Sequence, residues 1–90
     1  MSGQLNDKVY IVTGGSQGFG LAIAKCLVDK GAKVGLLSRS KAGLDKAISE
    51  IVSDHACAIS ADVTRKSELV AAFEKVKSHF GRLDGLVNNA

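Results

Sequence analysis

The 90-residue sequence has no proline or tryptophan, only two cysteines and no long uninterrupted apolar run. A helix that spans a bilayer needs about 18 or more apolar residues in succession, and no stretch approaches that length. The polar residues 1–8 also lack the apolar core of a secretion signal. We therefore expect no membrane partner and a cytoplasmic location.

Neither cysteine belongs to a C-x-x-C pair or to a metal-ligand spacing. Cys26 and Cys57 each lie in an apolar pattern, where a reduced and buried thiol is the usual state. His55 and His79 are expected at helix ends, where the helix dipole or solvent accounts for them. The sequence thus predicts a reducing compartment and no metal site.

A strong charge of either sign is missing too, because 12 Lys and Arg residues stand against 9 Asp and Glu residues, a net charge of +3. Basic clusters interleaved with aromatics, the usual mark of nucleic-acid binding, do not occur. With 46% apolar and 23% charged residues, the composition is typical of one small globular domain. We expect no nucleic-acid partner.

The most informative stretch is residues 9–20, V-Y-I-V-T-G-G-S-Q-G-F-G. Its apolar start predicts a strand, and a helical apolar pattern follows the glycine-dense turn at once. Glycine accepts positive φ and lets a phosphate come close, and the N-terminus of the helix offers unpaired N–H groups to such a group. The stretch predicts a phosphate-binding loop; an ordinary glycine-rich turn is the alternative.

Strands and helices alternate along the chain, with short loops between them. Strands are expected at residues 9–12, 33–38, 56–61 and 85–88, and helices from 19 to Gly31, from an N-cap at Ser40 to 51, and from an N-cap at Thr64 to Gly81. The first helix is expected to bury Phe19, Ala22, Ile23, Cys26 and Leu27. This order predicts an α/β fold, a doubly wound parallel sheet of strand order 3-2-1-4 with both faces covered. A ligand then belongs at the switch point, over the carboxyl ends of the first and fourth strands.

The T-G-x-x-x-G-x-G spacing of Gly14, Gly18 and Gly20 resembles the cofactor loop of the classical short-chain dehydrogenase/reductase family. The run D-x-L-V-N-N-A at 84–90 and Asp62-Val63 after the third strand resemble further markers of that family. Phe19 stands where isoleucine is usual, and we expect it to keep an apolar contact. The resemblance implies that residues 1–90 form the N-terminal part of a single Rossmann-type NADP-binding domain.

The resemblance also implies which residues bind the cofactor. Asp62 and the Val63 main chain hold the adenine, and Asn88 ties the central strands together; a cap or turn role is the alternative for Asp62, and a turn or packing role is expected for Asp84. The pyrophosphate loop comprises Gly14, Ser16, Gln17, Gly18, Phe19 and Gly20, and the adenosine ribose lies along Asn88, Asn89 and Ala90.

The end of the second strand decides between the two nicotinamide cofactors. A carboxylate there binds the 2′-hydroxyl of NAD, but no acidic residue occurs between positions 31 and 44. A guanidinium instead engages a 2′-phosphate with paired, charge-assisted hydrogen bonds. We therefore predict NADP(H) rather than NAD(H), with Arg39 as the clamp and Ser38, Ser40, Lys41 and Ser16 as helpers. An ordinary solvated loop residue is the alternative for Arg39.

The catalytic residues of the family, a serine and a Y-x-x-x-K pair, have no counterpart here, because the only tyrosine, Tyr10, is followed at position 14 by glycine. Glu50, Asp54 and Glu68 are expected on solvated helix faces. The chain is interpreted as the N-terminal portion of a longer oxidoreductase that acts on a small carbonyl or alcohol and forms a homo-oligomer. The alternative is a truncated, non-catalytic module that binds a dinucleotide or a partner protein.

Overall fold

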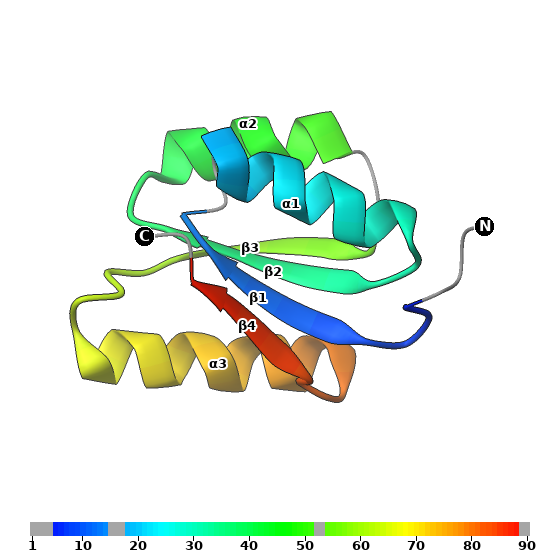
Figure 1. Ribbon diagram of the computed structural model, residues 1–90. Helices are drawn as coiled ribbons and strands as arrows, with labels where there is room; N and C mark the ends of the chain where they lie inside the picture. Colours follow the sequence, from blue (N-terminus) through cyan, green and yellow to red (C-terminus); the bar gives the residue numbers. More distant parts are fainter. Residues whose placement is uncertain (1–4, 15–17, 52–53, 89–90) are drawn as a thin grey trace.

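The computed structural model describes residues 5–14, 18–51 and 54–88. Strands and helices alternate along the chain (Figure 1). The elements are β1 (Val9–Thr13), α1 (Gly18–Asp29), β2 (Lys33–Ser38), α2 (Lys41–Ile51), β3 (Ala56–Ser60), α3 (Lys66–Phe80) and β4 (Gly85–Asn88). All neighbouring strands pair in parallel in the order β3-β2-β1-β4. The predicted fold class and strand order are confirmed.

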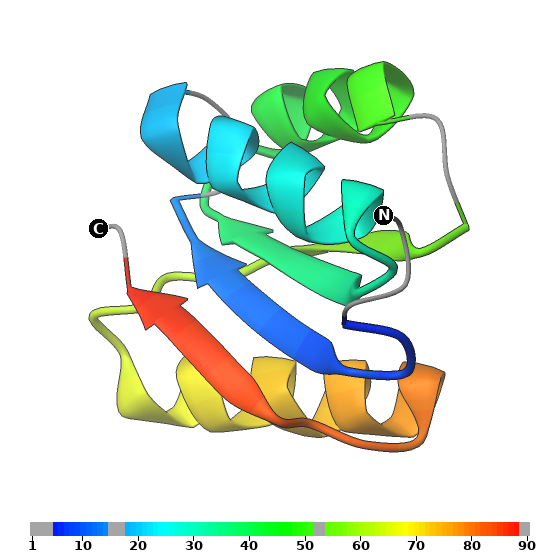
Figure 2. The ribbon, with the colours of Figure 1, turned by 45° about the vertical axis from the view of Figure 1, so that its right-hand side comes forward.

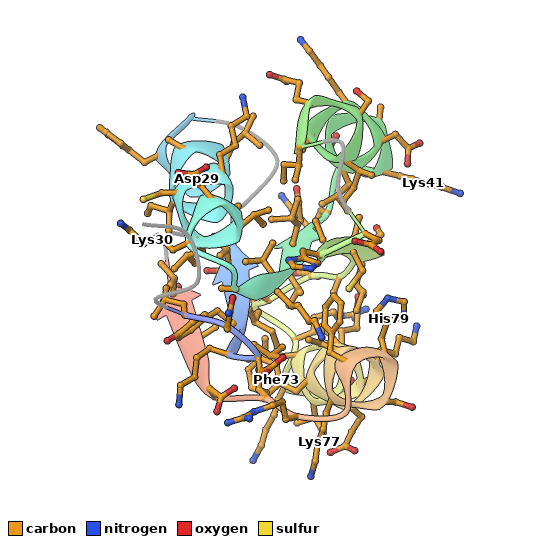
Figure 3. The ribbon with its side chains drawn as sticks, turned by 90° about the vertical axis from the view of Figure 1, so that its right-hand side faces the viewer. Asp29, Lys30, Lys41, Phe73, Lys77 and His79 are labelled. Atoms are coloured by element: carbon orange, nitrogen blue, oxygen red, sulfur yellow. The ribbon has the colours of Figure 1, made fainter. Side chains whose placement is uncertain are left out.

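The sheet is covered on both faces, by α1 and α2 on one and by α3 on the other (Figures 1 and 2). Buried strands of this kind carry apolar residues on both sides: Val12 of β1 packs with the residues of α1 and α2, whereas Val9 and Ile11 pack with α3. Figure 3 shows Phe73 between α3 and the sheet while Lys77 of the same helix points away from it. The two apolar layers hold the strand ends in fixed positions.

The closest approach of α3 to the sheet requires a glycine in the middle of β2. A Cβ atom at Gly35 would lie 2.5 Å from Cγ2 of Val76. Val76 is fully buried and cannot move aside easily. Gly35 pairs with Ile11 of β1 and Cys57 of β3, so it lies in the row of the sheet on which α3 rests.

Three of the four predicted helix signals are confirmed. Gly31 follows the end of α1 with φ of 95°, and its amide donates to the Val28 carbonyl at 2.9 Å. Ser40 precedes α2 and its Oγ accepts a hydrogen bond from the Gly43 amide at 3.0 Å, and Gly81 ends α3 with φ of 87°. The expected N-cap at Thr64 is wrong, because the residue before α3 is Arg65, which makes no side-chain cap. The Thr64 hydroxyl donates to Asp62 Oδ1 at 2.6 Å instead, since a nearby carboxylate competes with the helix for such a donor.

The buried face of α1 also differs from the expectation. Gly20 and Ala24 are buried, whereas Phe19 is 81% exposed and Cys26 is exposed. The smallest residues of α1 face the sheet because they allow the helix axis to come close to it, and this rotates the larger Phe19 outward. The predicted burial of Ala22 and Cys26 and the predicted apolar contact of Phe19 are therefore wrong. Ile23 and Leu27 are partly buried against the core beneath α1, as expected. Cys57 is half-buried, and burial raises the pKa of its thiol.

The amino ends of β1 and β4 are joined by Asp84. Its Oδ2 accepts hydrogen bonds from the Val9 amide at 2.8 Å and from Arg82 Nε at 2.9 Å, and its Oδ1 accepts one from Arg82 Nη2 at 2.6 Å. The Asp84 amide in turn donates to the Val9 carbonyl at 2.8 Å. The bonds from Arg82 and Val9 lower the pKa of the Asp84 carboxyl. Asp84 thus has the packing role that was expected for it.

Candidate functional site

The carboxyl ends of all four strands meet at one edge of the sheet, as parallel pairing requires. Thr13 pairs with Leu37 and with Asn88, and Ser38 pairs with Ser60. From β1 the chain crosses one face through α1 to β2, and it reaches β4 across the other face through α3 (Figure 2). In open α/β sheets the crevice at such a reversal of strand order is the usual ligand site.

The glycine turn leaves β1 at this edge. Gly14 and Gly18 have φ of 67° and 61°, a region that favours glycine because other residues carry a clashing Cβ. The Gly14 amide donates to the Leu37 carbonyl at 2.9 Å, which holds the start of the turn against β2. Gly18 begins α1, so the helix starts directly over the strand ends. Ser16 and Gln17, also predicted for this loop, lie outside the described residues.

Thr13 joins the carboxyl ends of β1 and β4. Its hydroxyl lies 3.1 Å from Asn88 Oδ1 and 3.4 Å from the Val87 carbonyl, in position to donate to either, and the residue is only 3% exposed. The contact matches the expected role of Asn88 in tying the central strands together. Sequence reasoning missed Thr13, although a threonine at the end of an apolar strand, directly before the first glycine, is a signal that could have identified it. Asn89 and Ala90 lie outside the described residues.

A cavity of about 230 Å³ lies beside this turn, over the ends of β1, β2 and β3. Its lining consists of Gly14, Leu37, Ser38, Arg39, Ala61, Asp62, Val63 and Thr64. Five residues singled out from the sequence therefore meet in one place: Gly14, Ser38, Arg39, Asp62 and Val63. Ser40 and Lys41 are not among the lining residues, because Ser40 caps α2 and Lys41 points outward at the start of α2 (Figure 3).

A larger cavity of about 360 Å³ opens at the outer side of β3, between α2 and α3, and includes Lys41, Asp45 and Lys75. Its lining includes no residue of the glycine turn and shares none with the smaller cavity. The smaller cavity is therefore the candidate site, since the strand ends, the turn and the charged side chains converge there.

Arg39 presents its charge at the rim of the candidate site. Its main chain is held in place, because its carbonyl accepts a hydrogen bond from Ser60 Oγ at 3.4 Å and the next amide, that of Ser40, donates to Ser38 Oγ at 3.2 Å. Its side chain is 79% exposed, and Nη1 lies 4.0 Å from Asp62 Oδ2. Ion pairs at this distance on an exposed surface contribute little, so the guanidinium can turn to another anion.

Asp62 is held by its neighbours in a tight turn. Its Oδ1 accepts hydrogen bonds from the Thr64 amide at 3.0 Å and from the Thr64 hydroxyl. These two bonds, with smaller contributions from the nearby Arg39 and Arg65, lower the pKa of the Asp62 carboxyl. Asp62 is therefore ionised at neutral pH. The turn role weighed as an alternative for Asp62 is real, and the same turn brings the residue into the cavity lining.

Glu68 corrects a further expectation. It was assigned to a solvated helix face, but its Oε1 accepts a hydrogen bond from the Asp62 amide at 3.0 Å, and its Oε2 lies 3.5 Å from Arg65 Nη1. The sequence carries no periodic signal for a contact between residues six positions apart across a loop. Only the path of the chain from β3 into α3 brings the two together.

Within residues 5–14, 18–51 and 54–88, no three His, Cys, Asp or Glu side chains are grouped so as to hold a metal ion. Among the helices of these same residues, none is long and apolar enough to cross a membrane.

A parallel, doubly wound sheet with a glycine turn at its switch point and a cavity over the adjoining strand ends defines a nucleotide-binding type of α/β domain. The comparisons with known proteins identify the family. The model of the short chain dehydrogenase family matches residues 8–90. The chain belongs to this family.

The relatives agree with this assignment over about a third of their own length. The chain is 43% identical over 93 residues to human 15-hydroxyprostaglandin dehydrogenase, whose name specifies NAD(+); the match covers 96% of this chain and 34% of that protein. It superposes on 3-ketoacyl-(acyl-carrier-protein) reductase from Brucella melitensis, complexed with NADH, with a TM-score of 0.87 and 40% identity over 92% of this chain and 34% of that one.

An actinorhodin polyketide ketoreductase with NADPH gives a TM-score of 0.88 at 34% identity, covering all of this chain and 35% of the other. The chain thus spans about a third of the length of the relatives it matches. One of these solved relatives carries NADH and the other NADPH, so membership of the family leaves the choice between the two cofactors to the local residues.

Proposed function

We propose that this chain provides the dinucleotide-binding portion of an oxidoreductase that uses NADP(H) in preference to NAD(H). The position of Arg39 carries the proposal. It follows the last residue of β2, lines the cavity and presents an exposed guanidinium there. In its full-length form the enzyme transfers a hydride between the nicotinamide ring and a small carbonyl or alcohol.

The residues around the cavity suit such a cofactor. The start of α1 at Gly18 offers amides for a pyrophosphate. The family's motif assigns Gly14, Ser16, Gln17, Phe19 and Gly20 to the same phosphate-binding segment. Asp62 and Val63 are assigned to the adenine. Asn88, Asn89 and Ala90 are assigned to the adenosine ribose. Each of these assignments follows the family's motif at the matching position of this chain.

Charge supports the phosphorylated cofactor. A carboxylate at the end of β2 repels a 2′-phosphate, and this position holds Ser38 and Arg39 instead. The carboxylate that does line the cavity, Asp62, already accepts two hydrogen bonds from Thr64. The weak 4.0 Å pair between Arg39 and Asp62 is readily exchanged for a phosphate, which offers more negative charge and paired acceptors.

This portion of the chain binds and orients, and we assign no proton transfer to it. Tyr10 lies near the amino end of β1, and its ring is so close to Gly85 that a Cβ there would meet it at 2.9 Å. Tyr10 therefore lies toward the opposite end of β1 from the carboxyl ends of the strands, where we propose that the cofactor binds. The bound nicotinamide supplies or accepts the hydride, and this chain's residues hold the dinucleotide in place.

The test is a calorimetric titration of NADP⁺ and NAD⁺ into the wild-type protein, Arg39→Ala and Lys46→Ala. Lys46 is an exposed cation on α2, so its removal controls for net charge. We expect wild type and the Lys46 variant to prefer NADP⁺. Arg39→Ala should lose about ten- to a hundredfold in affinity for NADP⁺ alone, the effect of a charge-assisted hydrogen bond worth roughly 1.5–3 kcal/mol. Equal affinity of the wild type for both cofactors contradicts the proposal.

A further inference from the structure

Glu68 links the first turn of α3 to the loop that lines the cavity. Its Oε1 accepts the hydrogen bond from the Asp62 amide at 3.0 Å, while its Oε2 faces Arg65 at 3.5 Å. The side chain is 41% exposed, so burial of apolar surface does not explain its position. The two polar contacts do.

This is not the usual role of a glutamate at the start of a helix. In a capping box the glutamate of the first turn accepts a hydrogen bond from the amide of the N-cap residue, which here is Arg65. Glu68 instead bonds the amide of Asp62, three residues before the cap. The contact therefore satisfies no amide of α3 and fixes the loop in front of it.

With Glu68 in place, Asp62 is held at three points. Its amide is bound by Glu68, its carbonyl accepts a hydrogen bond from the Arg65 amide at 3.0 Å, and its Oδ1 accepts from Thr64. The remaining oxygen, Oδ2, is the one that faces Arg39. Asp62, Val63 and Thr64 all line the cavity.

We propose that Glu68 is a positioning residue for the adenosine end of the cofactor: by fixing the Asp62 amide, it holds the Asp62–Thr64 turn in the orientation that binds the adenine. This inference rests on the proposed function, because it assigns the adenine to that turn. It adds a specific requirement, an acceptor at position 68 that reaches the Asp62 amide.

Four variants distinguish the hydrogen bond of Glu68 from its charge and from its ion pair with Arg65. Glu68→Gln keeps an oxygen acceptor but removes the charge. Arg65→Ala removes the ion pair but leaves the acceptor. Glu74→Ala removes an exposed carboxylate from the same helix and is the matched control. Glu68→Ala removes the acceptor altogether.

The experiment combines two measurements on these variants. Amide hydrogen exchange should show that the Asp62 amide loses protection in Glu68→Ala and keeps it in Glu68→Gln. Calorimetry uses 2′,5′-ADP, which contains only the adenosine half, and nicotinamide mononucleotide, which lacks it. Glu68→Ala should lose about three- to tenfold in affinity for 2′,5′-ADP, less than the loss of a direct charge-assisted contact, because Glu68 acts through the turn and does not touch the ligand. Binding of nicotinamide mononucleotide should not change, and Glu68→Gln, Arg65→Ala and Glu74→Ala should bind 2′,5′-ADP like wild type.

Wild-type protein that binds 2′,5′-ADP no more tightly than Glu68→Ala does overturns the role of Glu68 and leaves the proposed function intact. Wild-type protein that binds neither 2′,5′-ADP nor NADP⁺ overturns both. If Glu68→Ala is poorly folded, Glu68→Gln decides: loss of 2′,5′-ADP affinity in a folded Gln variant with a protected Asp62 amide contradicts the proposal, because the acceptor is still present.

Discussion

The two ends of the β1–β4 pair are held together by different chemistry. At the amino end, Asp84 accepts three hydrogen bonds of 2.6–2.9 Å from Arg82 and Val9. At the carboxyl end, the link is a neutral one between the Thr13 hydroxyl and Asn88, at 3.1 Å. The charged clamp therefore stands at the end opposite the candidate site, whereas the link beside the glycine turn is between uncharged groups.

Two aspartates show the same contrast. Asp84 directs both carboxylate oxygens at partners that belong to the fold. Asp62 directs only Oδ1 at its own turn and leaves Oδ2 toward Arg39, 4.0 Å away at the cavity. Both carboxyls have a lowered pKa, so a perturbed pKa alone does not distinguish the residue that we propose to bind the cofactor. What distinguishes Asp62 is its position in the cavity at the carboxyl ends of the strands.

Both ends of β1 and β4 belong to one sheet, and a change at Gly35 should perturb that sheet more than any other change considered below. Gly35→Ala places a Cβ 2.5 Å from Val76 Cγ2 and should lower the free energy of unfolding by about 1–3 kcal/mol, as overpacking does. Val76→Ala in the same chain should restore part of the loss relative to the sum of the single changes. Chemical denaturation of the two single variants and the double variant measures this. Strict additivity means that the two residues do not meet.

Asp84→Asn breaks the charged clamp and should separate stability from binding. The melting temperature should fall, because the bidentate pair with Arg82 and the charge-assisted bond from Val9 are both weakened. The ratio of NADP⁺ to NAD⁺ affinity should stay at its wild-type value, since the clamp lies at the opposite end of the strands from the cavity. Thermal melting measures the loss of stability, and calorimetry measures the affinity ratio. A changed cofactor preference contradicts the separation of roles.

The stability of the wild type and of Asp84→Asn should also respond differently to low pH. A carboxyl whose pKa is lower in the folded than in the unfolded state adds stability above its ordinary pKa of 3.8, and this stability disappears as the pH falls through the folded value. The wild type should therefore lose stability below about pH 4. Asp84→Asn should show a shallower loss over that range, measured by denaturation at a series of pH values. An identical slope in both proteins shows that Asp84 is not a source of the acid sensitivity.

The neutral link at the carboxyl end should give the smallest effect. Thr13→Val keeps the shape of the buried side chain and removes only the hydroxyl that faces Asn88. We expect a loss of about 1 kcal/mol in the free energy of unfolding, the net effect of one hydrogen bond. Denaturation curves of this variant and of Asp84→Asn can be compared directly. A larger loss for Thr13→Val reverses the ranking of the two ends.

The fold could be predicted from the sequence because its main signals are local. Apolar runs mark the strands and helices, and glycines mark the turns and helix ends. The expected ranges of β2 and β4 match the structure, and the strand order follows from alternation with short loops. The face of α1 did not follow, since counting apolar residues ignores size: Phe19 fits the pattern but Gly20 and Ala24 allow the closer approach to the sheet.

The candidate site was predictable where a motif marks it and not where the chain path creates it. Gly14 was identified from glycine spacing, Arg39 from charge and Asp62 from the resemblance to the family, and the three meet at the cavity. Glu68 was not, because its contact with Asp62 spans a loop with no repeating pattern. The capping role expected of Thr64 failed because Asp62, two residues earlier, competes for its hydroxyl. Contacts between polar side chains in loops depend on geometry that periodicity does not encode.

The contact between Arg39 and the extra phosphate of the cofactor can be observed directly by ³¹P NMR of the 2′-phosphate of NADP⁺ bound to wild type and to Arg39→Ala. A free phosphate monoester loses its second proton near pH 6, and an adjacent guanidinium favours the dianion. In the wild-type complex we expect the resonance to shift on binding and its pKa to fall, with both effects lost in the Arg39→Ala complex. If the 2′-phosphate bound to the wild type titrates as it does in free NADP⁺, the proposed contact between Arg39 and the 2′-phosphate is wrong.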